Sequence, residues 1–106
     1  MMTMNTAQFE QYTQAQAQPV LVEFSAPGCV YCRRIAPAME KIAEQYADSL
    51  LIGQVNIDDE EALADREQLE VVPTLVLYKN GQALGSIVAP ESKARIEEFI
   101  AQTLNG

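Results

Sequence analysis

The sequence predicts an α/β sandwich built around a mixed β-sheet, on three observations. Two nearly continuous apolar runs, Val20–Phe24 and Leu50–Ile57, are typical of strands buried on both faces. Other segments repeat apolar residues at helical spacing, so helices alternate with these strands. Asn80-Gly81 is a strong hairpin signal, which adds an antiparallel strand. With 106 residues, 48% of them hydrophobic, we expect one domain, residues 1–106, whose core needs no disulfide or metal.

The first predicted element is a helix that begins near Asn5 or Thr6 and ends in the Gln/Ala stretch before Pro19. Phe9 and Tyr12 are spaced three apart, so they share one helix face. We expect this face to make the apolar contacts of the helix.

The strand Val20–Phe24 contains a single polar interruption, the carboxylate of Glu23. A second helix follows the cysteine pair, which therefore lies at the N-terminus of that helix. Its apolar positions recur at helical spacing: Ile35, Met39, Ile42 and Tyr46. Pro37 is expected to kink this helix about one turn after it begins.

The middle of the chain alternates strand and helix again. Leu50–Ile57 reads as another central strand, and the acidic segment Asp58–Glu70 is expected to hold a short helix around Leu63. The segment Val71–Pro73 then leads into the apolar strand Thr74–Tyr78.

The C-terminal part is predicted as a hairpin followed by a helix. Asn80-Gly81 favours a type I′ turn that joins the preceding strand to a partner of about Gln82–Val88. Ser92 is the expected N-cap of the last helix. One face of that helix carries four apolar residues: Ile96, Phe99, Ile100 and Leu104.

The segment Cys29-Val30-Tyr31-Cys32 holds the only two cysteines of the chain, and their spacing favours thiol–disulfide exchange. A purely structural disulfide, or staple, is a weaker interpretation, because closing so short a loop stabilises a fold by only about 2 kcal/mol. A zinc site normally needs four Cys or His ligands, and this chain has no histidine, so metal would have to bind between molecules. The staple, the shared metal and idle cysteines remain as alternatives.

The charge of the chain argues against several function classes. A formal net charge of −8 predicts a surface that repels nucleic acid and anionic lipid. The N-terminal stretch before Pro19 contains no Lys or Arg and no continuous apolar run, and no segment approaches the length needed to cross a membrane. We therefore expect a reducing, cytoplasmic setting, where a Cys-x-x-Cys pair is more often catalytic than structural.

Six short motifs occur in a specific order and spacing: Val20–Phe24, Cys29–Arg33, Ile35–Pro37, Val55–Asp58, Val72–Thr74 and Lys79–Gly81. In this arrangement the chain resembles the thioredoxin family from about Met4 to Leu104. The resemblance implies the thioredoxin fold, a mixed central sheet flanked by helices on both faces, and a cis peptide bond between Val72 and Pro73. It also implies that an extended substrate segment pairs with the Val72 backbone beside Cys29.

The position of the cysteines predicts their roles. At a helix N-terminus the free backbone N–H groups and the helix dipole stabilise a thiolate, so the pKa of Cys29 should be lowered and Cys29 should be the nucleophile. Cys32, one turn on, is expected to resolve the mixed disulfide. Arg33 and Arg34 add positive charge, but they are equally well read as solvated helix residues, and we assign them no catalytic role.

Glu23 is the third candidate for a catalytic role. A carboxylate inside an apolar strand is costly as a buried charge, so its pKa should rise. Glu23 is similar in position to an aspartate of thioredoxins that accepts the proton of the resolving cysteine. The resemblance therefore implies that Glu23 is a candidate proton acceptor. The lysine that often accompanies that aspartate corresponds here to Gln54. A strand carboxylate without function is the alternative.

Several departures from the family pattern bear on partner choice. The chain has no tryptophan, and Ser25 and Gly28 stand where thioredoxins usually have two. Val30-Tyr31 replaces the usual Gly-Pro between the cysteines, and Tyr31 is similar to the tyrosine of glutaredoxins. Tyr31 is therefore a candidate aromatic contact for substrates, together with Val72 and Pro73. Ala89-Pro90 replaces a glycine in a substrate-facing loop, which should make that loop stiffer.

These observations predict an enzyme that reduces protein disulfides by a Cys29/Cys32 cycle, a general dithiol carrier. We expect disulfide-containing proteins as substrates, an upstream reductase as electron donor, no cofactor or metal, no nucleic-acid or membrane partner, and a monomer. The changed dipeptide suggests a reduction potential somewhat less reducing than that of thioredoxin, about −270 mV. Two alternatives stay open: a glutaredoxin-like enzyme that uses glutathione, and a non-enzymatic redox sensor or binding module.

Overall fold

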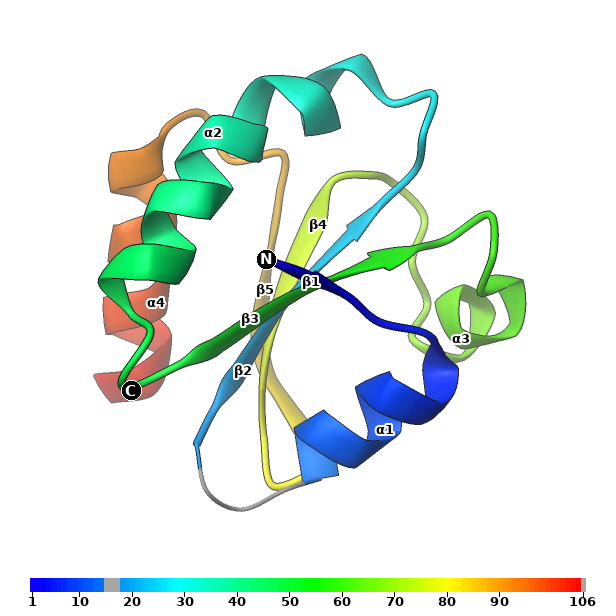
Figure 1. Ribbon diagram of the computed structural model, residues 1–106, viewed down its shortest axis with the longest axis horizontal. Helices are drawn as coiled ribbons and strands as arrows, with labels where there is room; N and C mark the ends of the chain where they lie inside the picture. The colour runs from blue at the N-terminus through cyan, green and yellow to red at the C-terminus, as the bar shows by residue number, and fades with distance from the viewer. Residues whose placement is uncertain (15–17, 106) are drawn as a thin grey trace.

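The computed structural model describes residues 1–14 and 18–105, which form a five-stranded mixed sheet with helices on both faces (Figure 1). In chain order the elements are β1 (Met2–Thr3), α1 (Thr6–Gln14), β2 (Val20–Ser25), α2 (Val30–Gln45), β3 (Leu51–Asn56), α3 (Glu61–Arg66), β4 (Thr74–Lys79), β5 (Gln82–Val88) and α4 (Lys93–Asn105). The predicted α/β architecture is confirmed. Within the described residues, no helix is both long and apolar enough to span a membrane.

The strand β2 lies at the centre of the sheet, whose order is β1-β3-β2-β4-β5. It runs parallel to β3 and antiparallel to β4, with Phe24 opposite Thr74. The segments that follow β2 and precede β4 therefore lie at the same end of the strands (Figure 1). The first of these segments carries Cys29, and the second carries Pro73. The edge strand β1, parallel to β3, is not predicted by the sequence, because two residues show no periodicity.

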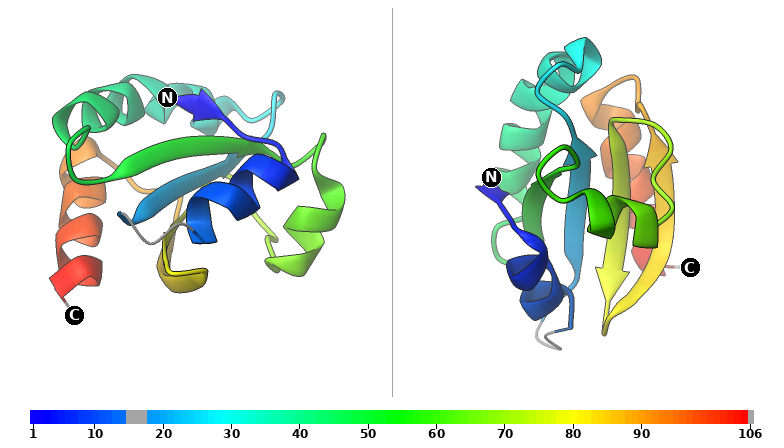
Figure 2. Two further views of the ribbon diagram at one scale, coloured as in Figure 1. Left: turned by 60° about the horizontal axis from the view of Figure 1, so that its bottom comes forward. Right: turned by 90° about the vertical axis from the view of Figure 1, so that its right-hand side faces the viewer.

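The two faces of the sheet bury separate apolar layers, because side chains along a strand alternate between faces. The layer under α2 and α4 consists of Leu21, Ile35, Met39, Ile42, Leu50, Ile52, Leu75, Leu77, Ile96, Phe99 and Ile100. The layer under α1 and α3 consists of Met4, Phe9, Val20, Val22, Phe24, Val55, Leu63, Val76 and Tyr78. Figure 2 shows the sheet between these two helix pairs.

The hairpin between β4 and β5 has the predicted turn. Asn80 and Gly81 both adopt positive φ angles, 54° and 79°, as a type I′ turn requires. Lys79 and Gln82 form the closing pair, and β5 has the predicted bounds. Asn-Gly is suited to this turn because both residues tolerate the left-handed region.

The helix ends agree with the sequence in part. Ser92 caps α4 as predicted, since its Oγ accepts a hydrogen bond from the Arg95 amide at 3.1 Å. Leu104 is 40% exposed in the last turn of α4 and does not join the core. The helix α2 continues through Pro37, and the kink expected there stays a prediction. The expected end of the first helix falls partly on residues 15–17, outside the described residues.

Candidate functional site

The two cysteines lie at the beginning of α2, where Cys29 is the N-cap residue. Cys29 has an extended backbone, with φ −84° and ψ 106°, and its Sγ accepts a hydrogen bond from the Cys32 amide at 3.0 Å. The side chains form a disulfide, with the Cα atoms 5.3 Å apart. Cys29 is partly exposed, whereas Cys32 is only 6% exposed. The pair therefore consists of one partly exposed cysteine and one buried cysteine.

The electrostatic surroundings of Cys29 favour a negative charge on its sulfur. The first turn of α2 contains no acidic residue, and its free N–H groups point toward the N-cap. The guanidinium of Arg33 does not bind the cysteines, because its Nη1 donates to the Pro27 carbonyl at 2.8 Å. Arg33 thus supports the loop before Cys29. A thiolate on Cys29 would be stabilised mainly by the N-terminus of α2.

The loop before β4 carries the other predicted contact residues. The Val72-Pro73 peptide bond is cis, which confirms that prediction. Pro73 is buried and Val72 is half-buried. The loop is held on both sides of Pro73, because the Thr74 hydroxyl donates to the Val71 carbonyl at 2.7 Å and the Ala89 amide donates to the Pro73 carbonyl at 2.8 Å. These two hydrogen bonds fix the backbone of the loop at the end of the sheet that also carries the cysteines.

Glu23 is buried in the middle of β2 and is only 1% exposed. It lies between Gln54 of β3 and Leu75 of β4, on the face covered by α2. Neither carboxylate oxygen has a hydrogen-bond partner among the described residues, and burial raises the pKa of Glu23 to about 7. The amide of Gln54 donates instead to the Ser25 hydroxyl at 2.9 Å. Glu23 is thus a proton-binding group near neutral pH, and nothing in residues 1–14 or 18–105 forms a hydrogen bond with its carboxylate.

A cleft of about 360 Å³ opens beside Cys32, on the side of β3. Its lining residues are Thr3, Ser25, Ala26, Pro27, Cys32, Arg33, Ala36, Gln54 and Asn56. Ser25 and Gln54 contribute uncharged polar groups to this wall. The cleft gives solvent a route to the side of the otherwise covered Cys32.

Tyr31 is placed differently from a simple surface aromatic. Its ring packs against the layer under α2 and α4, and its hydroxyl donates to the Pro90 carbonyl at 2.9 Å. Val30 is the exposed apolar residue of the dipeptide, with 58% of its surface exposed. The sequence did not predict that Val30 is the exposed apolar residue between the cysteines, or that the Pro90 carbonyl accepts a hydrogen bond from Tyr31. The substitution Ala89-Pro90 was the signal that this loop differs from the family pattern.

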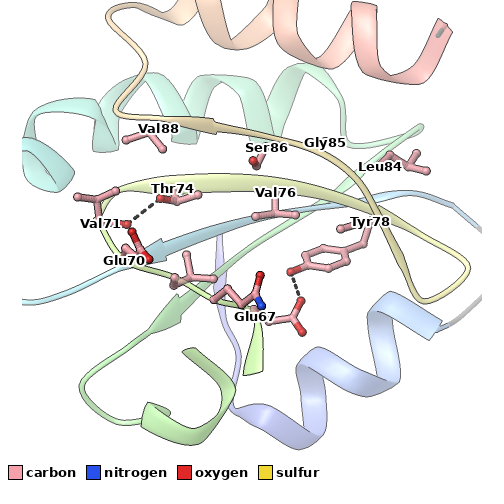
Figure 3. A pocket seen from close by; sticks show the side chains of 13 residues that line it. Glu67, Glu70, Val71, Thr74, Val76, Tyr78, Leu84, Gly85, Ser86 and Val88 are labelled. Carbon is pink, nitrogen blue, oxygen red and sulfur yellow. Dashed lines mark hydrogen bonds between the residues drawn. The ribbon is translucent and has the colours of Figure 1, made fainter. Parts of the chain in front are cut away.

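A second groove, of about 400 Å³, lies on the other face of the sheet between the segment 67–71 and β5 (Figure 3). The Tyr78 hydroxyl donates to Glu67 across its floor at 2.6 Å. Val71 and Val88 line one end of the groove, and no cysteine lines it. This groove is therefore separate from the disulfide.

The comparisons with known proteins agree with this geometry. A family model described as Thioredoxin matches residues 1–102. Thioredoxin 1 of Synechococcus elongatus is 36% identical over 98 residues, 92% of each chain, and a thioredoxin of Alicyclobacillus acidocaldarius is 33% identical over 103 residues, 97% of each chain. The structure of Plasmodium falciparum thioredoxin matches with a TM-score of 0.86 at 25% identity, covering 96% of this chain and 98% of that one.

Proposed function

Because this chain belongs to the thioredoxin family and is a thiol–disulfide oxidoreductase, we propose that it reduces disulfides in protein substrates through Cys29 and Cys32. The family resemblance and the thioredoxin fold predicted from the motifs are confirmed. The observation that carries the proposal is the Cys29 sulfur at the N-terminus of α2, disulfide-bonded to Cys32 and bonded to its amide.

The proposed reaction moves two electrons from the dithiol to the substrate. The Cys29 thiolate attacks one sulfur of the substrate disulfide, forms a mixed disulfide, and releases the first substrate sulfur, which takes a proton from solvent. Cys32 loses its proton and attacks the Cys29 sulfur. This step forms the Cys29–Cys32 disulfide and releases the second substrate sulfur as a thiolate, which takes a proton from solvent. Partial exposure of Cys29 and coverage of Cys32 support this division of roles.

Glu23 is the proposed acceptor of the Cys32 proton. Its pKa of about 7 leaves a substantial fraction as carboxylate at neutral pH, and that fraction can accept a proton. The rate of mixed-disulfide resolution should therefore fall as the pH drops below about 7. Single-turnover decay of a preformed mixed disulfide measures this step, and Glu23→Gln should remove its pH dependence in that range.

For direct substrate contact we propose Val72, Pro73 and the aromatic ring of Tyr31. The fixed backbone around Pro73 supports the pairing of an extended substrate segment with Val72. We further propose an upstream reductase as electron donor, a monomeric single-domain protein, and a cytoplasmic setting, where the pair is kept reduced. No cofactor is required by the proposed electron balance.

The proposal is tested by insulin reduction with dithiothreitol as electron source. The chain should accelerate the reaction, and Cys29→Ser and Cys32→Ser should each abolish the acceleration. A substrate mixed disulfide should accumulate in Cys32→Ser and be absent in Cys29→Ser, because only the former keeps the nucleophile. Acceleration by Cys29→Ser equal to the wild type would refute the assignment.

A glutathione-coupled assay with a glutathione mixed disulfide as substrate tests the glutaredoxin-like alternative. That alternative requires the protein to be active in this assay. A redox sensor would show a reversible two-electron transition in graded glutathione buffers without accelerating insulin reduction. The same titration gives the reduction potential, for which we expect a value somewhat above about −270 mV.

A further inference from the structure

Tyr31 joins two segments that are far apart in the sequence. It lies between the two cysteines at the first turn of α2, and its hydroxyl donates to the carbonyl of Pro90 in the loop between β5 and α4. Pro90 is buried, and buried carbonyls normally need a hydrogen-bond donor. The Tyr31 hydroxyl is the donor to the Pro90 carbonyl. The cysteine turn and the β5–α4 loop are thereby fixed relative to each other.

The same loop has a second attachment, to the loop that carries the cis-proline. Ala89 has a φ of 43°, in the left-handed region that residues with a Cβ rarely adopt. In this conformation its amide donates to the Pro73 carbonyl at 2.8 Å. Tyr31, Ala89 and Pro73 thus connect three segments at one end of the strands.

Two features of Tyr31 distinguish it from a residue that only fills space. Its ring already packs against the apolar layer under α2 and α4, so its position does not depend on the hydroxyl. Its hydroxyl reaches the loop that Ala89 and Pro90 form, and removal of that group alone would leave the ring and the cysteines in place. The hydroxyl therefore acts on the loop.

We propose that Tyr31 is a positioning residue whose hydroxyl holds the Ala89-Pro90 loop beside Pro73 and so fixes the loops against which an extended protein substrate lies. This inference rests on the proposed reduction of protein disulfides. Tyr31 then favours protein disulfides over small ones, because the polypeptide beside a protein disulfide must fit against the Ala89-Pro90 loop and the loop that carries Pro73. A small disulfide reaches Cys29 without contacting the loop.

The test compares Tyr31→Phe with Tyr46→Phe in the full chain. Tyr46 also packs against the same apolar layer, at the C-terminal end of α2, and its hydroxyl makes no hydrogen bond within the part of the chain that the structure describes. For insulin, Tyr31→Phe should raise KM about fivefold with little change in kcat, which corresponds to about 1 kcal/mol. Tyr46→Phe should leave KM unchanged.

The same variants are then assayed with the small disulfide 5,5′-dithiobis(2-nitrobenzoate) and by amide hydrogen exchange. With the small disulfide, we expect Tyr31→Phe to react within about twofold of the wild type. The transition state of that reaction makes no contact with the Ala89-Pro90 loop, so moving the loop does not change its energy. Exchange of the Ala89 amide, which donates to Pro73, should accelerate about fivefold or more in Tyr31→Phe only.

The outcomes separate the two proposals. Equal losses with insulin and the small disulfide, or unchanged exchange at Ala89, would overturn the positioning role. If wild-type protein fails to reduce insulin, the proposed function fails, while the exchange at Ala89 still reports whether Tyr31 holds the loop.

Discussion

Glu23→Gln should change how the stability of the oxidised protein depends on pH. The carboxyl is 1% exposed without a hydrogen-bond partner among the described residues, and burial raises its pKa from 4.5 to about 7. Between these pH values the folded protein holds a proton that the unfolded chain has released, so stability must fall as the pH rises. The full shift is worth about 3 kcal/mol, and most of it is lost between about pH 5 and pH 8.

The measurement is the free energy of unfolding in urea at several pH values between about 5 and 8, with the disulfide intact. Glutamine keeps the size and polarity of the side chain but cannot ionise. The stability of Glu23→Gln relative to the wild type should therefore improve by about 2–3 kcal/mol from the lowest to the highest pH. Glu44→Gln, at an exposed position of α2, is the matched control and should run parallel to the wild type.

Two results would refute this reasoning. Parallel curves for Glu23→Gln and the wild type would mean that the carboxyl titrates at its ordinary pKa when folded. A wild-type protein that gains stability through this pH range, relative to Glu23→Gln, would mean that an undetected partner stabilises the carboxylate, because only a depressed pKa gives that sign.

Further substitutions test the packing and the turn. Tyr78→Phe should lower the free energy of unfolding by about 1–2 kcal/mol, because it removes the buried hydroxyl that donates to the carboxylate of Glu67; an unchanged urea midpoint would contradict this. Gly53→Ala should cost about 1–3 kcal/mol, since a Cβ there would lie 2.5 Å from Cε of the buried Met4, and thermal unfolding measures the loss. Gly81→Ala should cost about 1 kcal/mol from its φ of 79°, and equal stability by denaturation would argue against the type I′ geometry.

Much of the fold could be predicted from the sequence because its signals are local. The buried strand β2 is a continuous apolar run, and Asn80-Gly81 specifies a turn through the φ angles that these residues tolerate. The strand β1 could not be predicted, because its two residues gain their extended form only by pairing with β3. The exposure of Leu104 depends on where the last turn of α4 ends relative to the core, which periodicity does not report.

The candidate site divides in the same way. Spacing placed the cysteines at a helix N-terminus, and an acidic residue inside an apolar strand indicated the raised pKa of Glu23. The contact of Tyr31 with Pro90 joins residues almost sixty positions apart. No local pattern predicts a hydrogen bond between distant loops, so this contact required the tertiary structure.

The hydrogen bond from the Cys32 amide to the Cys29 sulfur has a consequence for the speed of redox cycling. The donor is a backbone N–H of the first turn of α2, so it belongs to the helix and not to a freely rotating side chain. A thiolate that forms on Cys29 after reduction therefore meets a dipole that is already oriented toward it. Cys29 is the attacking thiolate when a substrate is reduced and the leaving group when its own disulfide is reduced, so the same N–H group stabilises the developing charge in both half-reactions.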